Sequence, residues 1–72
     1  MKLVLHLVAS CIYARSTPDD SSAVTIVKSG ELMALDAETV ELGFCRALSP
    51  RLGLVWIRAG LVGFEGSLRR VR

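Results

Sequence analysis

The chain has 72 residues, of which 51% are apolar and 22% charged, and its formal net charge at pH 7 is +2. A chain of this length forms one small domain, residues 1–72, and its apolar content excludes a disordered polypeptide. No stretch reaches the roughly 18 apolar residues of a membrane-spanning helix, so no membrane span is expected. So large an apolar fraction is difficult to bury in so small a domain, and we therefore expect a protein partner or a homo-oligomer.

Residues 2–14 alternate with the period of a β-strand. Leu3, Leu5 and Leu7 fall on one face, whereas His6 falls on the other. The pattern predicts one long strand. At a sheet edge, the backbone of this strand could extend the sheet of a neighbouring molecule, with Leu3, Leu5 and Leu7 as strand-edge or oligomer contacts.

A polar loop and a hairpin are expected next. Residues 16–22 contain a proline, two aspartates and four hydroxyl side chains, which interrupt regular structure and predict a solvent-exposed loop. Residues 24–28 are rich in β-branched side chains, residues 29–30 can form a tight turn, and residues 31–35 can return as a second strand. This order predicts a β-hairpin.

Residues 37–48 are predicted to form a short helix. Asp36 can cap its N-terminus, Arg46 lies in its last turn, and apolar side chains form a stripe along one side. Gly43 argues against this helix, because glycine costs about 1 kcal/mol relative to alanine in a helix interior. A strand over residues 39–44 is the alternative, since every second side chain there is apolar.

Residues 51–72 fit two structures. One is an amphipathic helix, with apolar side chains at three-four spacing: Leu54, Ile57, Leu61, Phe64, Leu68 and Val71. Four glycines would together cost that helix about 3–4 kcal/mol, which favours β structure. The favoured β segment has a buried strand over residues 52–58, a turn at 59–60, a return over 61–64 and a turn at 65–66. The predicted fold class is therefore α+β: a strand-rich domain with an N-terminal strand and hairpin, one short helix and a C-terminal β segment, or alternatively a C-terminal amphipathic helix.

Charge is divided unevenly along the chain. Residues 1–45 carry three basic and six acidic groups, whereas residues 46–72 carry six arginines and one glutamate. Guanidinium groups pair with phosphates and carboxylates, so the C-terminal half predicts contact with phosphate or an acidic surface. The candidate residues are Arg51, Arg58, Arg69, Arg70 and Arg72. Opposite charges in the two halves also suit head-to-tail self-association. Residues 68–72 are expected to form a basic tail, which can alternatively be solvated and without partners.

Three functions are compatible with these features. A protein-binding or self-assembling module is favoured, and adaptors, inhibitors and assembly factors, including those of phage and viruses, are proteins of this kind. Nucleic-acid binding through the C-terminal arginines is the alternative, although the chain offers few aromatic rings to stack on bases and has no Asn or Gln. A helix over residues 51–72 would suit a protein that lies in a membrane interface, which is the second alternative.

Catalytic, cofactor and metal sites are not predicted. His6 is the only imidazole, and in a regular strand it points away from Cys11. Positions 6, 11 and 45 lack the paired spacing of zinc ligands, and the glycines lack the lysine and hydroxyl residue of a phosphate-binding loop. We therefore predict a protein that is not an enzyme and that uses no cofactor or metal.

The two cysteines bear on the compartment. Cys11 and Cys45 are expected to be buried free thiols, with a disulfide between them as the alternative. Residues 8–11 resemble a lipoprotein cleavage box, but the preceding segment has one charge and an apolar run interrupted by His6. We expect a cytoplasmic protein, with a secreted protein or lipoprotein as the alternative.

Overall fold

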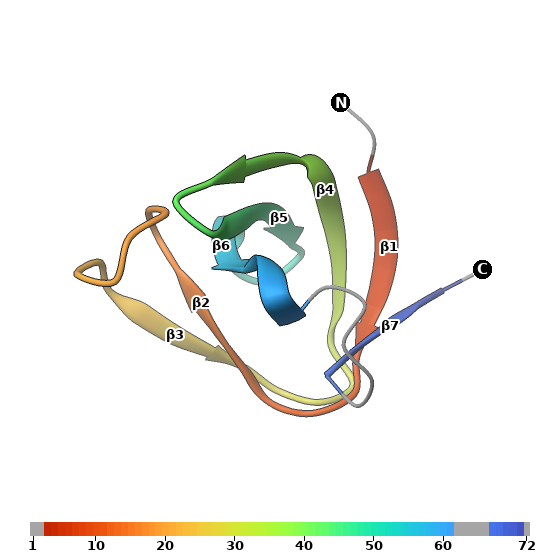
Figure 1. Cartoon of the computed structure of the whole chain (residues 1–72). Coiled ribbons are helices and arrows are strands. Elements are labelled where there is room, and N and C mark those ends of the chain that lie inside the picture. The colour runs from red at the N-terminus through yellow and green to blue at the C-terminus, as the bar shows by residue number, and fades with distance from the viewer. Residues whose placement is uncertain (1–2, 62–66, 72) are drawn as a thin grey trace.

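In the computed structural model, which describes residues 3–61 and 67–71, the chain forms a strongly curled antiparallel sheet of seven strands (Figure 1). The strand order is β3-β2-β6-β5-β4-β1-β7, and every neighbouring pair is antiparallel. The elements are β1 (Leu3–Val8), β2 (Ile12–Arg15), β3 (Val24–Val27), β4 (Leu32–Glu41), β5 (Phe44–Ser49), β6 (Gly53–Arg58), the 3-10 helix η1 (Ala59–Leu61) and β7 (Leu68–Arg70).

Four strands belong to one long, bent ribbon. β1 pairs with β4 and β2 pairs with β3 in a single continuous register, so that residues 3–15 and 24–36 run side by side. At the bend the amide of Val8 donates to the carbonyl of Glu31 (2.8 Å), and the amide of Gly30 donates to the carbonyl of Val8 (2.7 Å). The bend carries β2 away from β1 and onto β6, which curls the sheet around its core.

The long strand predicted over residues 2–14 is therefore wrong in one respect, because β1 and β2 are separate strands with an irregular segment at residues 9–11. The predicted hairpin is wrong in its pairing. Both of its strands exist, but β3 pairs with β2, and β4 pairs with β1 and β5. The turn at residues 29–30, where Gly30 has a φ of 94°, redirects the ribbon and does not fold β4 back onto β3.

The helix predicted over residues 37–48 is wrong. The end of β4, a turn at residues 42–43 and β5 occupy this segment, and β4 shifts register between Asp36 and Val40. Leu42 and Gly43 have φ values of 51° and 83°, which a right-handed helix excludes. The alternative, a strand over residues 39–44, is correct only for residues 39–41, which end β4, and for Phe44, which begins β5, because the turn at residues 42–43 interrupts it. Because η1 is the one helical turn among the described residues, the domain is an antiparallel β-sheet protein and the helix of the α+β prediction is not found.

The strand predicted over residues 52–58 is confirmed as β6, so the amphipathic helix is wrong there. The expected turn at residues 59–60 falls in η1. The predicted return strand and second turn fall mostly on residues 62–66, which lie outside the described residues. Leu68–Arg70 form β7, paired with β1, where a solvated tail was the other possibility.

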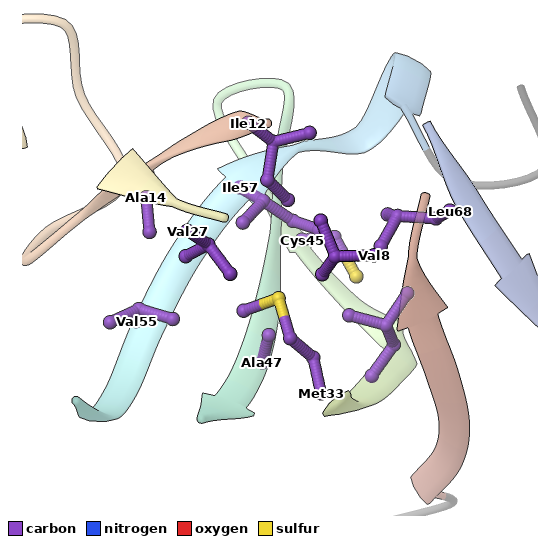
Figure 2. Packing of buried hydrophobic residues seen from close by; sticks show 11 residues of the cluster. Val8, Ile12, Ala14, Val27, Met33, Cys45, Ala47, Val55, Ile57 and Leu68 are labelled. Atoms are coloured by element: carbon purple, nitrogen blue, oxygen red, sulfur yellow. The ribbon is translucent and has the colours of Figure 1, made fainter. Parts of the chain in front are cut away.

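The core lies inside the curl of the sheet (Figure 2). Strands from both ends of the ribbon contribute to it, and the side chain of Leu68 joins β7 to the same cluster. Its buried members are Val8, Ile12, Ala14, Val27, Met33, Leu35, Cys45, Ala47, Val55, Ile57 and Leu68. Successive side chains of a strand point to opposite faces, so burial of this set leaves an opposite face of β1, β4, β5 and β6 turned outward.

Candidate functional site

The outer face of the sheet is rich in exposed leucines. The register places one residue of each of four adjacent strands in a row: Leu5, Ala34, Leu48 and Leu54. Directly paired residues of antiparallel strands project from the same face, so these side chains are neighbours. Five leucines on this face are each at least 40% exposed, and we call them the leucine face: Leu3, Leu5, Leu32, Leu48 and Leu54.

A groove of about 230 Å³ hollows this face. It is lined by Leu3, Asp36, Arg46, Ala47, Leu48 and Leu54, which come from β1, β4, β5 and β6. Leu48 and Leu54 line its apolar end, whereas Asp36 and Arg46, in one row with Leu3, place two charged groups at the other end. Such a groove suits the apolar side chain of a bound molecule, with a polar group near Arg46.

A buried carboxylate organises the charged end of the groove. The Asp36 side chain is only 1% exposed, and its Oδ2 accepts hydrogen bonds from Arg46 Nη2 and Thr39 Oγ1, both at 2.7 Å. Its Oδ1 lies 3.3 Å from the amide of Glu38. The hydrogen bonds from Thr39 and then from Arg46 lower the pKa of Asp36. The carboxylate is therefore ionised at neutral pH and holds Arg46, whose side chain remains 30% exposed, beside the leucines.

The lowered pKa predicts acid sensitivity. A carboxylate whose pKa is lower in the folded state stabilises the fold fully above its unfolded-state pKa, near 3.8, and this stabilisation is lost as pH falls through the folded-state value. We expect Asp36→Asn to lower the melting temperature at pH 7 and to flatten its decline between pH 4 and pH 2. Thermal unfolding followed by circular dichroism across this range measures both effects. Glu41→Gln, the same change at an exposed position of β4, is the control, and parallel profiles for Asp36→Asn and the wild type would contradict the assignment.

The three leucines predicted as strand-edge or oligomer contacts differ in exposure. Leu3 and Leu5 are exposed on the leucine face, and Leu7 is half-buried beside β7. β1 lies between β4 and β7, but β7 pairs only with His6–Val8, and the amide of Val71 donates to the carbonyl of Leu5. From Leu5 onward the backbone of β1 is therefore not free to extend a neighbouring sheet, and the outermost described strands of the sheet are β3 and β7.

The structure separates the candidate arginines. Arg51 precedes β6 and Arg58 ends it, which places their backbones roughly 20 Å apart at about 3.3 Å per residue. Arg51 pairs with Glu31 (Nε to Oε1, 3.0 Å) and also donates to the carbonyl of Ile26 (3.0 Å), a backbone group on β3. Arg51 thus satisfies one of the backbone carbonyl groups at the β3 edge of the sheet.

The other arginines have different surroundings. Arg58 Nη2 lies 2.6 Å from Asp20 Oδ1, and the guanidinium stacks over the ring of Phe44 at 5.1 Å. Arg69 and Arg70 are exposed on opposite faces of β7, and Arg69 pairs with Leu7 and so projects on the side of the leucine face. Arg72 lies outside the described residues. The four arginines among the described residues therefore do not form one continuous patch around a single end of the sheet.

The remaining reactive side chains are dispersed. Both cysteines are free, as expected, but Cys11 is exposed, which corrects the prediction that both are buried. Cys45 is in the core, where burial raises the pKa of its thiol. His6 is buried and its Nδ1 donates to the carbonyl of Val4 (2.9 Å). Within residues 3–61 and 67–71, no three His, Cys, Asp or Glu side chains gather as metal ligands, and no helix is long and apolar enough to cross a membrane.

Sequence reasoning missed three of the five leucines of this face, namely Leu32, Leu48 and Leu54. The sequence places Leu48 in the predicted helix over residues 37–48 and Leu54 in the predicted strand over residues 52–58, with a C-terminal helix as the alternative, and it makes Asp36 and Arg46 helix-end residues. The signal that could have found them is the two leucines on either side of a turn at residues 50–52, because a β-hairpin there brings Leu48 and Leu54 into one cross-strand pair.

Fold and face together define a small antiparallel β-sheet domain with one apolar face in its core and a second one outside. Compared with models of known protein families, with curated proteins and with solved structures, the chain matches none. Its function is therefore inferred from the outer face itself.

Proposed function

We propose that the chain is a small, non-catalytic protein-binding module that acts through the leucine face. The observation that carries this proposal is the gathering of five exposed leucines on one side of the sheet. Single exposed leucines are ordinary, but contiguous apolar patches on small proteins mark sites of association. The groove between the leucines and Arg46 adds the concave shape that a bound side chain requires.

The charged groups on this face favour a binding function over a catalytic one. Asp36 is held by Thr39 and Arg46 as an ionised acceptor, and no hydrogen bond described for His6 reaches outside β1. A general base or nucleophile must reach its substrate, and the exposed surface of the groove is leucine with one guanidinium. Such a surface recognises shape, apolar area and negative charge.

The first test uses a neutral apolar dye, Nile red, and light scattering. We expect the wild type to enhance the dye fluorescence or to self-associate at high concentration, and the double variant Leu5→Ser, Leu54→Ser to lose most of either signal. Leu42→Ser is the matched control, because Leu42 is an exposed leucine at the turn between β4 and β5, away from the leucine face. A monomer that does not bind the dye, or a double variant that behaves like the control, would refute the proposal.

A further inference from the structure

Two arginines of the described residues lie on the same side of the sheet as the leucine face. Arg46 borders the groove, and Arg69, opposite Leu7, projects on the same side. Arg69 belongs to β7, which lies next to β1 (Figure 1). The carboxylate of Asp36 is 1% exposed and is paired with Arg46, and Glu31, next to Leu32, is paired with Arg51. The register also places the exposed Glu41 on this side of the sheet, opposite Phe44 and beyond Arg46 at the end of β4. A molecule that covers the leucines therefore meets two guanidinium groups at the border of the face.

We propose that the leucine face binds an acidic amphipathic helix of a partner protein, an inference that rests on the proposed function above. A helix with apolar side chains along one stripe and acidic side chains beside it matches both features of this surface, since leucines receive the stripe and arginines receive the carboxylates. A helix also has no unpaired backbone groups along its length. It can therefore lie on the face of a sheet without needing a free strand edge.

The positions of the two arginines set the length of the helix. Arg46 is level with Leu3 through Asp36, whereas Arg69 is level with Leu7. Along the strands this is four residues, about 13 Å, and from β5 to β7 it is three strand spacings, about 14 Å. The diagonal is roughly 20 Å, which a helix rising 1.5 Å per residue covers in about 13 residues. The acidic side chains are therefore expected near both ends of a three- to four-turn segment.

A second copy of the chain fits this face less well. Two copies that met through their leucines would bring together four exposed guanidinium groups, and each face offers only the buried carboxylate of Asp36 and the exposed one of Glu41 at the end of β4 among the described residues. Like charges brought together across an interface oppose association. A lipid surface also fits less well, because Trp56, the chain's single indole, is buried and does not project as an interfacial anchor.

The test compares three synthetic peptides for binding to the intact protein. The first has a leucine stripe flanked by glutamates over 16 residues, the second replaces the glutamates by lysines, and the third scrambles the acidic sequence. Fluorescence anisotropy of labelled peptide gives the affinity in low and high salt. We expect the acidic peptide to bind about tenfold more tightly than the lysine peptide in low salt, a preference that high salt reduces.

Variants locate the site. Leu54→Ser is expected to weaken binding of the acidic peptide, and Arg69→Gln to reduce its preference over the lysine peptide. Arg70→Gln is the matched control, because it makes the same change in the same strand on the opposite face. All three substitutions are at exposed positions, and circular dichroism verifies that each variant is folded.

Each other outcome overturns the inference in a recognisable way. Equal affinity for the acidic and lysine peptides would remove the charge argument. A dimer dissolved by Leu54→Ser would assign the face to a second copy, and binding to phosphatidylserine vesicles in place of the peptide would assign it to lipid. In these cases the leucine face remains a docking surface, whereas loss of leucine dependence in the dye and scattering experiment would refute the proposed function itself.

Discussion

Replacing Ile57 with alanine is expected to lower the free energy of unfolding by about 2–5 kcal/mol. Ile57 is 0% exposed and lies in the core cluster on β6, opposite Cys45 of β5. The loss combines the transfer free energy of the removed methyl and methylene groups with the cavity that they leave. Total stabilities of small domains are about 5–15 kcal/mol, so this single change removes a large share of the stability. Urea unfolding followed by circular dichroism measures it.

Leu54→Ala is the control for this experiment. Leu54 lies on the same strand but on the outer face, where it is 54% exposed. Its truncation is expected to change stability by no more than about 0.5 kcal/mol, as is usual at surface positions. Equal losses for the two variants would show that the inner and outer faces of β6 have been assigned incorrectly.

Gly43→Val is expected to destabilise the domain by about 1–3 kcal/mol through the backbone alone. Gly43 has a φ of 83°, a conformation that a β-branched residue adopts only with strain. An added Cβ at this position meets nothing within 4 Å, so steric collision with other parts of the chain does not contribute. Urea unfolding of the variant gives the loss directly.

Gly60→Ala is the control for Gly43→Val, because it also replaces a glycine but at a position where no backbone strain is expected. Gly60 lies in η1 without a positive φ, and an added Cβ there also has open space. Alanine at such a site restricts the unfolded chain and is expected to stabilise the domain by about 0.4–1 kcal/mol. If Gly43→Val and Gly60→Ala shifted stability in the same direction, the turn at residues 42–43 would have a different backbone from the one described.

The strands were easier to predict than their pairing. Residues 24–28 and 52–58 are rich in β-branched and aromatic side chains, and both contain strands in the structure. The pairing depends on the bend at residues 9–11, and a period of two continues across that bend without a visible break. Long-range partners, such as Arg15 with Trp56, are set by closure of the sheet, which local patterns do not encode.

The predicted helix failed for an identifiable reason. The apolar positions of residues 37–48 satisfy a helical stripe and a strand alternation together, and the register shift in β4 after Asp36 disturbs the strand pattern. Gly43 was the residue that distinguished the two structures. Asp36 does accept hydrogen bonds from a backbone amide and a hydroxyl group, as a helix cap would. It lies in the irregular part of a strand, however, and not at the end of a helix.

The candidate site was predicted in part. The alternation of residues 2–14 identified Leu3 and Leu5 as surface leucines, whereas Leu48 and Leu54 became visible only once β5 and β6 were paired. Proximity in sequence suggested one arginine cluster. In the structure these arginines lie apart, because neighbouring residues of β7 point to opposite faces and residues at the two ends of β6 are far from each other.

Pairing of β1 with β7 also has a kinetic consequence. Leu7 and Arg69 are about sixty residues apart in sequence. Their pairing therefore requires closure of a long loop, and the entropy of that closure is lost before the contact between β1 and β7 can stabilise the fold. The β2–β3 hairpin and the hairpins β4–β5 and β5–β6 close much shorter loops, and the β2–β3 pairing can extend into that of β1 with β4 without this closure. The rate of folding is therefore set by topology more than by helix or strand propensity, and the domain belongs among the proteins that fold in milliseconds to seconds.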